Sequence, residues 1–461
     1  MSVVGAFIVP HPPIIIPEVG QGEEQKIIDT IKSYQEVARR IAKLRPDTIV
    51  ITTPHSILYS DYFHISPGNN ASGNLSRFGA KNISVNVKYD NEFVCALAIS
   101  ATDAGLKAGT EGEKDAFLDH GTIIPLYFIN QYLKEYKVIR VGLSGQSLIN
   151  HYRLGRCIAE TADALSRRVV FVASGDLSHT LKEDGPYGYT PEGVLFDSEI
   201  TQAMKEGDFL RFLEFSPDLV DVAAECGLRS FVIMAGSLSG KEVKPEFLSY
   251  EGPFGVGYAV CSYDIIGKNE DRHFDKIYNK KQLEHLMERK AKEDTYVRLA
   301  RLSLETYIKT GEQAKLPEDL PEELLGMQAG VFVSLKMYGD LRGCIGTISP
   351  ATGCIAKEIR QNAVSAGTED PRFSPIREEE LSKLVYSVDV LTDPEPINTV
   401  EELDVKRYGV IVTSRRKRGL LLPNLEGIDT PEKQVSIAMQ KAGILKNEEY
   451  SLERFEVVRH K

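Results

Sequence analysis

Histidines that directly follow apolar, strand-like segments are the chemically most informative feature of this sequence. The chain of 461 residues contains nine histidines. His11 follows the segment VVGAFIVP, His55 follows TIVITTP, and His179 ends the loop SGDLSH after VVFVA. A single histidine after a strand usually forms a hydrogen bond with a backbone group of its own loop, but three histidines in equivalent places favour a shared site. Imidazole is the commonest protein metal ligand and also moves protons near neutral pH.

The segments before these histidines predict the sheet that would position them. Four runs are short, β-branched and without polar alternation, which is typical of strands covered on both faces. These runs lie at residues 3–9, 48–53, 137–143 and 169–173. Helical stretches of crossover length lie at residues 24–43 and 152–167. We therefore predict an α/β domain over residues 1–267, with a mostly parallel sheet and helices on both faces. Ligands of such sheets bind beyond the carboxyl ends of the strands, where the histidines would converge.

Two adjacent residues could supply the third metal ligand. The segment DVAAECGLRSFVIMAG contains Glu225 and Cys226 at the expected start of a helix. Two histidines and a carboxylate form the facial triad of non-haem Fe(II) oxygenases, whereas two histidines and a thiolate favour copper or zinc, with iron still open. Glu225 could equally be a solvated carboxylate at a helix N-terminus, and Cys226 a small buried apolar residue. The spacing leaves these alternatives open.

The second half of the chain has a different pattern. Residues 268–293 are almost all charged or polar, and we interpret 268–288 as a linker between the first domain and a second one at 289–461. The linker runs into a helix that begins near Glu288. Strands are predicted at 330–336, 384–391 and 408–413, and helices at 352–364 and 431–441. This order predicts an α+β fold.

The segment LRGCIGT is the most distinctive motif of the second half. Arg342 and Cys344 flank a glycine, and a guanidinium near a thiol lowers its pKa and makes it more nucleophilic. A tight hairpin with a buried cysteine is the simpler interpretation of the same residues. The basic run at 415–418 is short and has no interleaved aromatic residues, so we interpret it as a solvated hairpin turn.

Five short motifs of the first domain, taken in order, resemble those of LigB-type class III extradiol dioxygenases and Memo proteins. They are VPHPP at His11, TPHS at His55, LDHG at His120, SGDLSH at His179 and AAECG at Glu225. The resemblance implies that His11 and His55 bind the metal, with Glu225 as third ligand in the dioxygenases or Cys226 in Memo. It further implies that His179 is the catalytic acid–base and that His120 orients dioxygen or substrate.

The function implied by this resemblance is the opening of a catechol-type aromatic ring, with Fe(II) as the expected metal and copper or zinc as alternatives. The second hypothesis is a Memo-like iron- or copper-binding component that does not cleave rings. Many LigB-like proteins are multimers, so the resemblance also implies a homo-oligomer.

The second domain resembles the AMMECR family. The resemblance rests on LRGCIGT, DPRFSPI and YGVIVTSRRKRGLLLP, and it implies a cleft that carries Arg342, Cys344 and Asp370. The fusion of a LigB/Memo-like domain to an AMMECR-like domain resembles the AmmeMemoRadiSam system. The resemblance to that system implies a radical SAM protein as a partner. This chain has no C-x₃-C-x₂-C cluster motif, so we do not expect it to carry the radical SAM chemistry itself.

Composition excludes several other classes. A net charge of −11 disfavours a nucleic-acid partner. No apolar run approaches the roughly 18 residues needed to cross a membrane, and the start of the chain has no signal-peptide pattern. The six cysteines form no C-x-x-C pair and no disulfide framework. We therefore expect a cytoplasmic protein with reduced thiols.

Overall fold

The computed structural model describes residues 3–461, with the exception of residues 113, 115–116, 338–339, 426 and 446. The chain divides into two compact units, Met1–Lys280 and Lys281–Lys461. The division falls inside the segment that we interpreted as a linker. Most of that segment is helical, because α10 runs over Phe274–Lys292 and α11 over Thr295–Thr310. The helix that we expected near Glu288 therefore begins earlier, and it is interrupted before α11.

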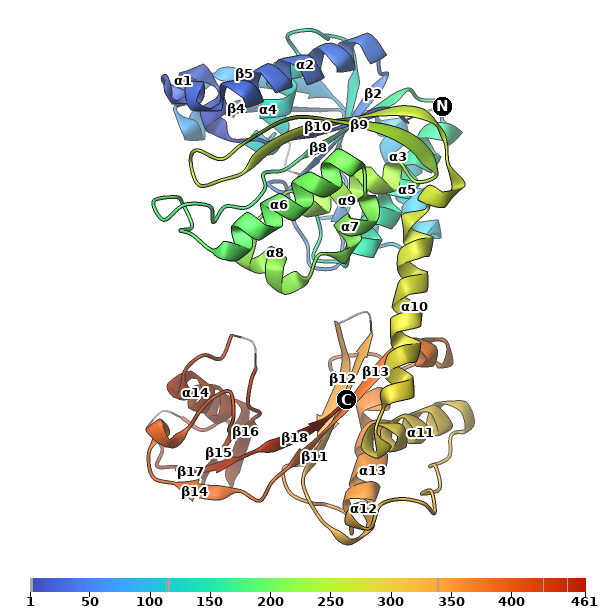
Figure 1. Cartoon of the computed structure of the whole chain (residues 1–461), viewed down its shortest axis with the longest axis vertical. Helices are drawn as coiled ribbons and strands as arrows, with labels where there is room; N and C mark the ends of the chain where they lie inside the picture. Colours follow the sequence, from blue (N-terminus) through green and yellow to red (C-terminus); the bar gives the residue numbers. More distant parts are fainter. Residues whose placement is uncertain (1–2, 113, 115–116, 338–339, 426, 446) are drawn as a thin grey trace. The chain divides into compact units, whose positions relative to one another are not determined.

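A six-stranded sheet is the centre of the first unit, in the order β7-β2-β8-β1-β10-β9 (Figure 1). β7, β2, β8 and β1 are parallel to one another, and β10 and β9 add antiparallel strands at one edge. The strands are β1 (Val3–Val9), β2 (Thr48–Thr53), β7 (Lys137–Gly142), β8 (Val169–Ser174), β9 (Lys241–Glu251) and β10 (Tyr258–Lys268). All six residues of β2 are buried, since it lies between two strands and is covered on both faces. The predicted, mostly parallel sheet is confirmed.

Helices cover both faces of this sheet, as predicted. α2 (Ile28–Leu44) and α4 (His120–Ile129) share one apolar core with it. The opposite core contains residues of α3 (Asn91–Asp103), α5 (Leu148–Ala164), α6 (Pro191–Glu206), α7 (Phe209–Glu214) and α9 (Leu228–Ser237). The remaining helices of the unit are α1 (Pro17–Gly20), α8 (Pro217–Ala223) and the 3₁₀ turns Pro13–Ile15, Glu23–Ile27, Ser76–Phe78 and Glu270–Arg272.

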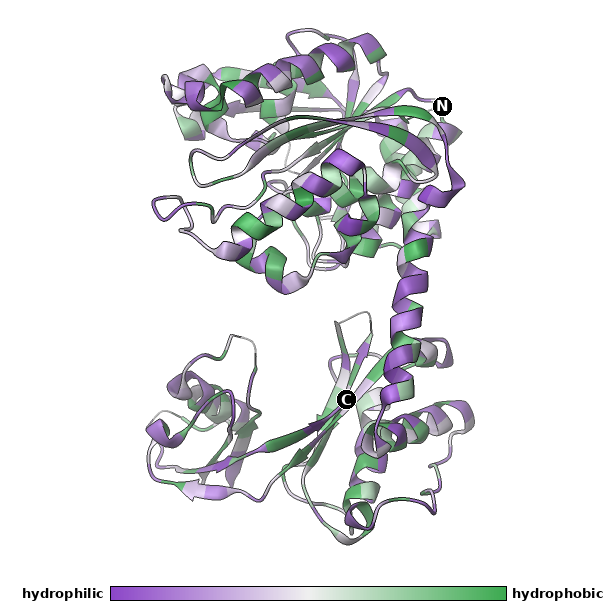
Figure 2. Cartoon of the chain, viewed as in Figure 1, coloured by the Kyte–Doolittle hydropathy of each residue, from purple (hydrophilic) through white to green (hydrophobic). Residues whose placement is uncertain are grey.

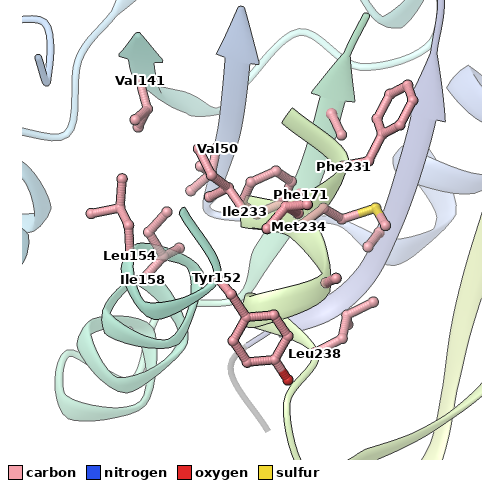
Figure 3. Close-up of a cluster of buried hydrophobic side chains, with 14 of the residues drawn as sticks. Val50, Val141, Tyr152, Leu154, Ile158, Phe171, Phe231, Ile233, Met234 and Leu238 are labelled. Carbon is pink, nitrogen blue, oxygen red and sulfur yellow. The ribbon is translucent and has the colours of Figure 1, made fainter. Parts of the chain in front are cut away.

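Helices α5 and α9 pack closely against each other and against the sheet. Figure 3 shows Val50 and Phe171 of the sheet beside Ile158 of α5 and Ile233 of α9. A Cβ atom on Gly155 would lie 1.9 Å from the Ile233 carbonyl oxygen. The absence of a side chain at this glycine therefore lets the helices approach, which sets the position of α9 over the sheet.

The two helices predicted in the first unit have shifted bounds, as has the helix predicted at 352–364, which spans Ile355–Thr368. Residues 23–27 form a 3₁₀ turn, so α2 begins at Ile28 instead of residue 24. α5 spans Leu148–Ala164 instead of residues 152–167. Ser166 has a φ of 55°, in the left-handed region that ends helices, so the helix stops before it.

The long connection between β2 and β7 contains small strands of its own. β4 (Asn70–Leu75) and β5 (Ala80–Lys88) form an antiparallel hairpin, and β3 (Phe63–His64) pairs in parallel with β6 (Ala108–Gly109). We had predicted none of these strands. β5 alternates buried and exposed residues over most of its length, which is the period-2 pattern of a half-buried strand.

The second unit has an α+β fold, as predicted. It contains two four-stranded sheets in the orders β12-β11-β13-β18 and β14-β17-β15-β16. Neighbouring strands in both sheets are antiparallel. The strands are β11 (Val331–Met337), β12 (Asp340–Gly346), β13 (Leu384–Leu391), β14 (Glu395–Ile397), β15 (Gly409–Ser414), β16 (Lys417–Leu421), β17 (Ser451–Phe455) and β18 (Val457–His460). The helices after α11 are α12 (Glu322–Gly326), α13 (Ile355–Thr368), α14 (Pro431–Ala442) and the 3₁₀ turns Glu378–Lys383 and Val400–Glu402.

Helix α10 is polar over most of its surface, and Figure 2 draws it mostly in purple. Asp275 is its only buried residue, and it is paired with Arg156 at 2.7 Å. Among the described residues, no helix combines the length and the apolar composition that crossing a bilayer requires.

Candidate metal centre

His11 and His55 come together beyond the carboxyl ends of neighbouring parallel strands. His11 lies two residues after β1 and His55 two residues after β2. β8 pairs with both strands, and its parallel register places their ends at the same edge. The Nε2 atoms of the two imidazoles are 2.9 Å apart. Two ring nitrogens at this separation can share one ion.

A buried hydrogen-bond chain sets the tautomer of His11. The Ser174 hydroxyl donates to the Gly121 carbonyl oxygen at 2.6 Å, which uses its single hydrogen. Ser174 Oγ therefore accepts a hydrogen bond from His11 Nδ1 at 2.9 Å. The proton of the neutral ring is on Nδ1, and the lone pair of Nε2 points to His55. Burial lowers the pKa of His11 well below its usual value, which favours this neutral ring.

Cys226 lies beside the histidine pair. Its Sγ is 3.6 Å from His11 Nε2 and accepts a hydrogen bond from the Asp176 N–H at 3.3 Å. A close approach of two glycines makes this possible, since a Cβ on Gly175 would lie 2.2 Å from the Cα of Gly227. His11, His55 and Cys226 thus offer three ligand atoms that all lie within 4.8 Å of one another.

Glu225 has a different partner. Its carboxylate accepts a hydrogen bond from the Leu228 N–H at 2.6 Å, in the first turn of α9. Burial raises the pKa of Glu225 to about 7. The clusters of potential metal ligands among the described residues contain Cys226 and do not contain Glu225. Of the two adjacent candidates, the structure therefore brings the thiol to the histidine pair.

His120 stacks on His55. The two ring centroids are 4.0 Å apart, with 29° between the ring planes. His120 is the first residue of α4, whose N-cap is Asp119. The Asp119 carboxylate accepts a hydrogen bond from the Thr53 hydroxyl at 2.6 Å, and Thr53 Oγ1 accepts one from the His55 N–H at 3.2 Å. This chain of contacts ties the loops of both histidines together.

His179 lies near Cys226. Its Nε2 is buried and has no hydrogen-bond partner among the described residues, while its ring faces Tyr187 at a centroid distance of 5.4 Å. Burial lowers the pKa of His179, with the nearby Asp176 acting in the opposite direction. A neutral imidazole with an open ring nitrogen next to a metal centre can accept a proton from a bound molecule.

Asp176 is a site residue that we missed in the sequence. With His179 and Cys226 it forms a second cluster of potential ligand atoms, and its Oδ1 accepts a hydrogen bond from the His11 N–H at 2.7 Å. Burial raises the pKa of Asp176 to about 6. Its place in the loop SGDLSH, directly after β8, was the available signal, because polar residues after parallel strands collect at the same edge.

Two of the three separations between the donor atoms fit a transition-metal ion. An ion about 2.1 Å from nitrogen and about 2.3 Å from sulfur leaves neighbouring ligand atoms about 3.0–3.6 Å apart at angles of about 90–110°. The separations of 2.9 Å between nitrogens and 3.6 Å from nitrogen to sulfur are close to this range. Burial raises the pKa of the Cys226 thiol, so metal binding here would release its proton.

In the second unit, the three residues predicted to line a cleft, Arg342, Cys344 and Asp370, each form hydrogen bonds with neighbouring residues. The Arg342 guanidinium donates to both carboxylate oxygens of Glu380, at 2.9 and 3.2 Å. Asp370 accepts hydrogen bonds from the Cys344 N–H at 2.8 Å and from the Arg372 guanidinium at 2.7 and 2.9 Å. The Cys344 thiol sulfur accepts a hydrogen bond from the Ser334 hydroxyl at 3.2 Å. Cys344 and Asp370 therefore lie together, whereas the charge of Arg342 is directed to Glu380.

Two families match the chain, one in each unit. Residues 5–261 match the family described as the catalytic LigB subunit of aromatic ring-opening dioxygenase, and residues 297–460 match the AMMECR1 family. A protein of Clostridium acetobutylicum is 45% identical over 477 residues, which span the whole of both chains. A Thermotoga maritima protein is 47% identical over 171 residues, covering 37% of this chain and 98% of its own.

Two solved structures were found to be similar to parts of the chain, both with TM-scores below 0.5. An uncharacterized protein from Pyrococcus horikoshii is 34% identical, covers 36% of this chain and 88% of its own, and has a TM-score of 0.34. An uncharacterized protein from Escherichia coli K12 is 14% identical, covers 57% of this chain and 99% of its own, and has a TM-score of 0.38.

Proposed function

Because this chain belongs to the family of the catalytic LigB subunit of aromatic ring-opening dioxygenases, with an AMMECR1 domain at its C-terminal end, we propose that its first unit is a metal-dependent oxidoreductase. The substrate is a catechol-type aromatic molecule, and the metal is ferrous iron held by His11, His55 and Cys226. The observation that carries the proposal is the convergence of these three donor atoms beside the open Nε2 of His179.

Each residue has a defined task in this proposal. Ferrous iron would supply Lewis acidity and a template for diol and oxygen. Ser174 keeps the lone pair of His11 Nε2 available by accepting the Nδ1–H. His179 takes the proton of a substrate hydroxyl at its Nε2, which has no hydrogen-bond partner in the described part of the chain. His120 orients the substrate next to His55, on which it stacks.

A second function is favoured by one specific observation. Cys226, and not Glu225, faces the histidine pair, so the donor set departs from the two-histidine, one-carboxylate triad of non-haem iron oxygenases. A thiolate also suits copper or zinc. The alternative is therefore a metal-binding component, acting with a radical SAM partner, that does not open aromatic rings.

Oxygen uptake separates the two functions. The full chain is purified without oxygen, loaded with Fe(II) and supplied with catechol or 3,4-dihydroxybenzoate in the presence of ¹⁸O₂. Ring opening consumes one O₂ per diol, breaks one ring carbon–carbon bond and adds both oxygen atoms to the product, which mass spectrometry detects. His179→Ala should keep its iron and lose activity by about 100-fold or more, as expected for an acid–base residue.

The control is His285→Gln, an exposed histidine of α10 that should leave activity unchanged. If iron binds stoichiometrically but neither diol consumes oxygen, the ring-opening proposal is wrong and the second function is preferred. If His179→Ala is as active as the wild type, His179 has no role in proton transfer.

A further inference from the structure

A cavity of about 1070 Å³ lies at the amino ends of the parallel strands, away from the metal centre. Its lining includes Asp47, which precedes β2, Lys137, which begins β7, and Arg167, which lies two residues before β8. β2 and β7 have six residues each, so about 20 Å of strand separates this cavity from the end that carries the histidine pair. The volume is at the upper end of the range for small-molecule sites. The cavity is therefore a separate candidate site.

The β4–β5 hairpin and the end of α4 supply uncharged polar groups to the cavity wall. Asn70 of β4 lies opposite Lys88 of β5 in the hairpin, and both line the cavity. Asn130, the C-cap of α4, accepts a hydrogen bond at its Oδ1 from the Tyr136 hydroxyl at 2.7 Å. This bond orients the amide and leaves its Nδ2 as a donor. The wall thus offers side-chain amides that can both donate and accept hydrogen bonds.

Asp90 is the one charged lining residue with no exposed surface. Its Oδ2 accepts hydrogen bonds from the Thr48 hydroxyl at 2.7 Å and from Arg167 Nε at 3.2 Å. Its Oδ1 is buried 3.5 Å from the Lys137 ammonium and accepts no hydrogen bond in the part of the chain that the structure describes. Buried polar atoms normally have hydrogen-bond partners, because leaving one without a partner costs free energy. A donor on a ligand would satisfy this oxygen.

The charges of the lining residues nearly cancel. The cations are Lys88, Lys134, Lys137 and Arg167, and the anions are Asp47, Asp90 and Glu135. Arg167 also forms an ion pair with Glu92. An anion in the cavity would be repelled by Asp90, and a cation would be repelled by Lys137 and Arg167. A neutral hydroxyl can accept from the ammonium and donate to the carboxylate at the same time, so it suits both groups.

We propose that this cavity binds a neutral polyhydroxylated molecule, such as a sugar or a cyclic polyol. One ligand hydroxyl donates to Asp90 Oδ1 and accepts from Lys137, and the amide of Asn130 is available to another. Val87 and the ring of Tyr136, which also line the cavity, provide apolar surface for the C–H groups of the ligand. This binding site is independent of the proposed function, because it needs neither the metal nor ring opening.

Ligand-observed NMR on the full chain tests the inference with five probes. D-glucose, sucrose and myo-inositol are neutral and polyhydroxylated, whereas inorganic phosphate and spermidine represent anions and cations. At least one neutral probe should bind, and the two charged probes should not. Asp90→Asn and Lys137→Gln should each weaken binding of the neutral probe about tenfold, as expected for the loss of one charge-assisted hydrogen bond. Lys137 is half-exposed, so its variant keeps the test valid if Asp90→Asn impairs folding.

Two control variants locate the binding. Lys81→Gln removes another lysine of β5, which is exposed and outside the cavity, and should leave the affinity unchanged. His11→Ala changes the metal centre and should also leave it unchanged. The inference is overturned if no neutral probe binds, if Lys137→Gln binds as tightly as the wild type, or if His11→Ala abolishes binding. Binding of phosphate or spermidine that depends on Lys137 would mean that the cavity takes a charged ligand, which contradicts the proposed class.

Discussion

The protein contains two partly exposed thiols in contrasting surroundings, Cys226 in the first unit and Cys344 in the second. Cys226 faces two imidazoles whose Nε2 atoms point to each other and to the thiol. Cys344 lies beside Asp370, whose carboxylate already accepts hydrogen bonds from Arg372 and from the Cys344 N–H. Among the described residues, Cys226 belongs to two clusters of potential metal ligands and Cys344 belongs to none.

The contrast indicates that a thiol alone does not make a metal site, and that neighbouring ring nitrogens with available lone pairs are also needed. At Cys226 the nearby ring nitrogens have lone pairs that an ion can use, because Ser174 holds the His11 proton on the far side of the ring. At Cys344 the nearby carboxylate is neutralised by a guanidinium. An ion there would have to break a charge-assisted pair before it could bind.

Removal of the Cys226 thiol should have the largest effect. Cys226→Ala should weaken metal binding by more than about 100-fold. Removing a residue that only hydrogen-bonds to a ligand lowers metal affinity by about 10–100-fold, and removing the ligand itself should lower it further. Glu225→Gln, at the adjacent position, should keep stoichiometric metal. Elemental analysis of both variants and of Cys344→Ala is the measurement. Loss of the metal in Glu225→Gln, together with its retention in Cys226→Ala, would reverse the assignment of the third ligand.

A smaller loss is expected when the hydrogen bond behind His11 is removed. Ser174→Ala should lower metal affinity by about 10–100-fold, because His11 Nδ1 loses the acceptor that fixes its tautomer. Competition with a metal chelator gives the affinity. Ser144→Ala removes another fully buried serine hydroxyl, two residues after β7, and serves as the control. Equal affinity of Ser174→Ala and wild type would show that the tautomer does not matter for binding.

The smallest effect should come from the second unit and should depend on pH. The Arg372 guanidinium beside Asp370 holds the pKa of that carboxyl well below its usual range. Asp370→Asn should destabilise this unit by roughly 1.5 kcal/mol at neutral pH, the worth of a charge-assisted hydrogen bond. Because the folded pKa is depressed, this stabilisation is present above the unfolded pKa of about 3.9 and is lost as pH falls towards the folded pKa.

Hydrogen exchange of peptides from residues 331–391 measures this stability separately from that of the first unit. The difference between wild type and Asp370→Asn should be constant from about pH 5.5 to pH 8 and should shrink below about pH 4. Glu369→Gln changes the neighbouring exposed carboxylate and should have little effect. A difference that persists undiminished in acid would mean that packing, and not charge, accounts for the loss.

Strands were easier to predict than the loops between them. The four buried parallel strands coincide with their predicted ranges to within one residue, because an unbroken β-branched run has few alternatives to a strand covered on both faces. The β4–β5 hairpin was missed, although Ile83, Val85 and Val87 alternate with polar residues. Its partner strand contains asparagine, serine and glycine, so only the pairing itself identifies it as a strand.

The edge of the sheet that carries the candidate metal ligands is predictable from the amino-acid sequence. Parallel strands end on the same side, so histidines that follow β1, β2 and β8 must collect there in any fold with this strand order. The choice between Glu225 and Cys226 as the residue beside the histidine pair depends on tertiary packing. Their side chains diverge according to where α9 begins and how closely Gly227 approaches Gly175, and these are contacts between segments about fifty residues apart. A sequence pattern does not distinguish two adjacent candidate ligands. Packing directs Cys226 to the histidine pair and Glu225 to the N-terminus of α9.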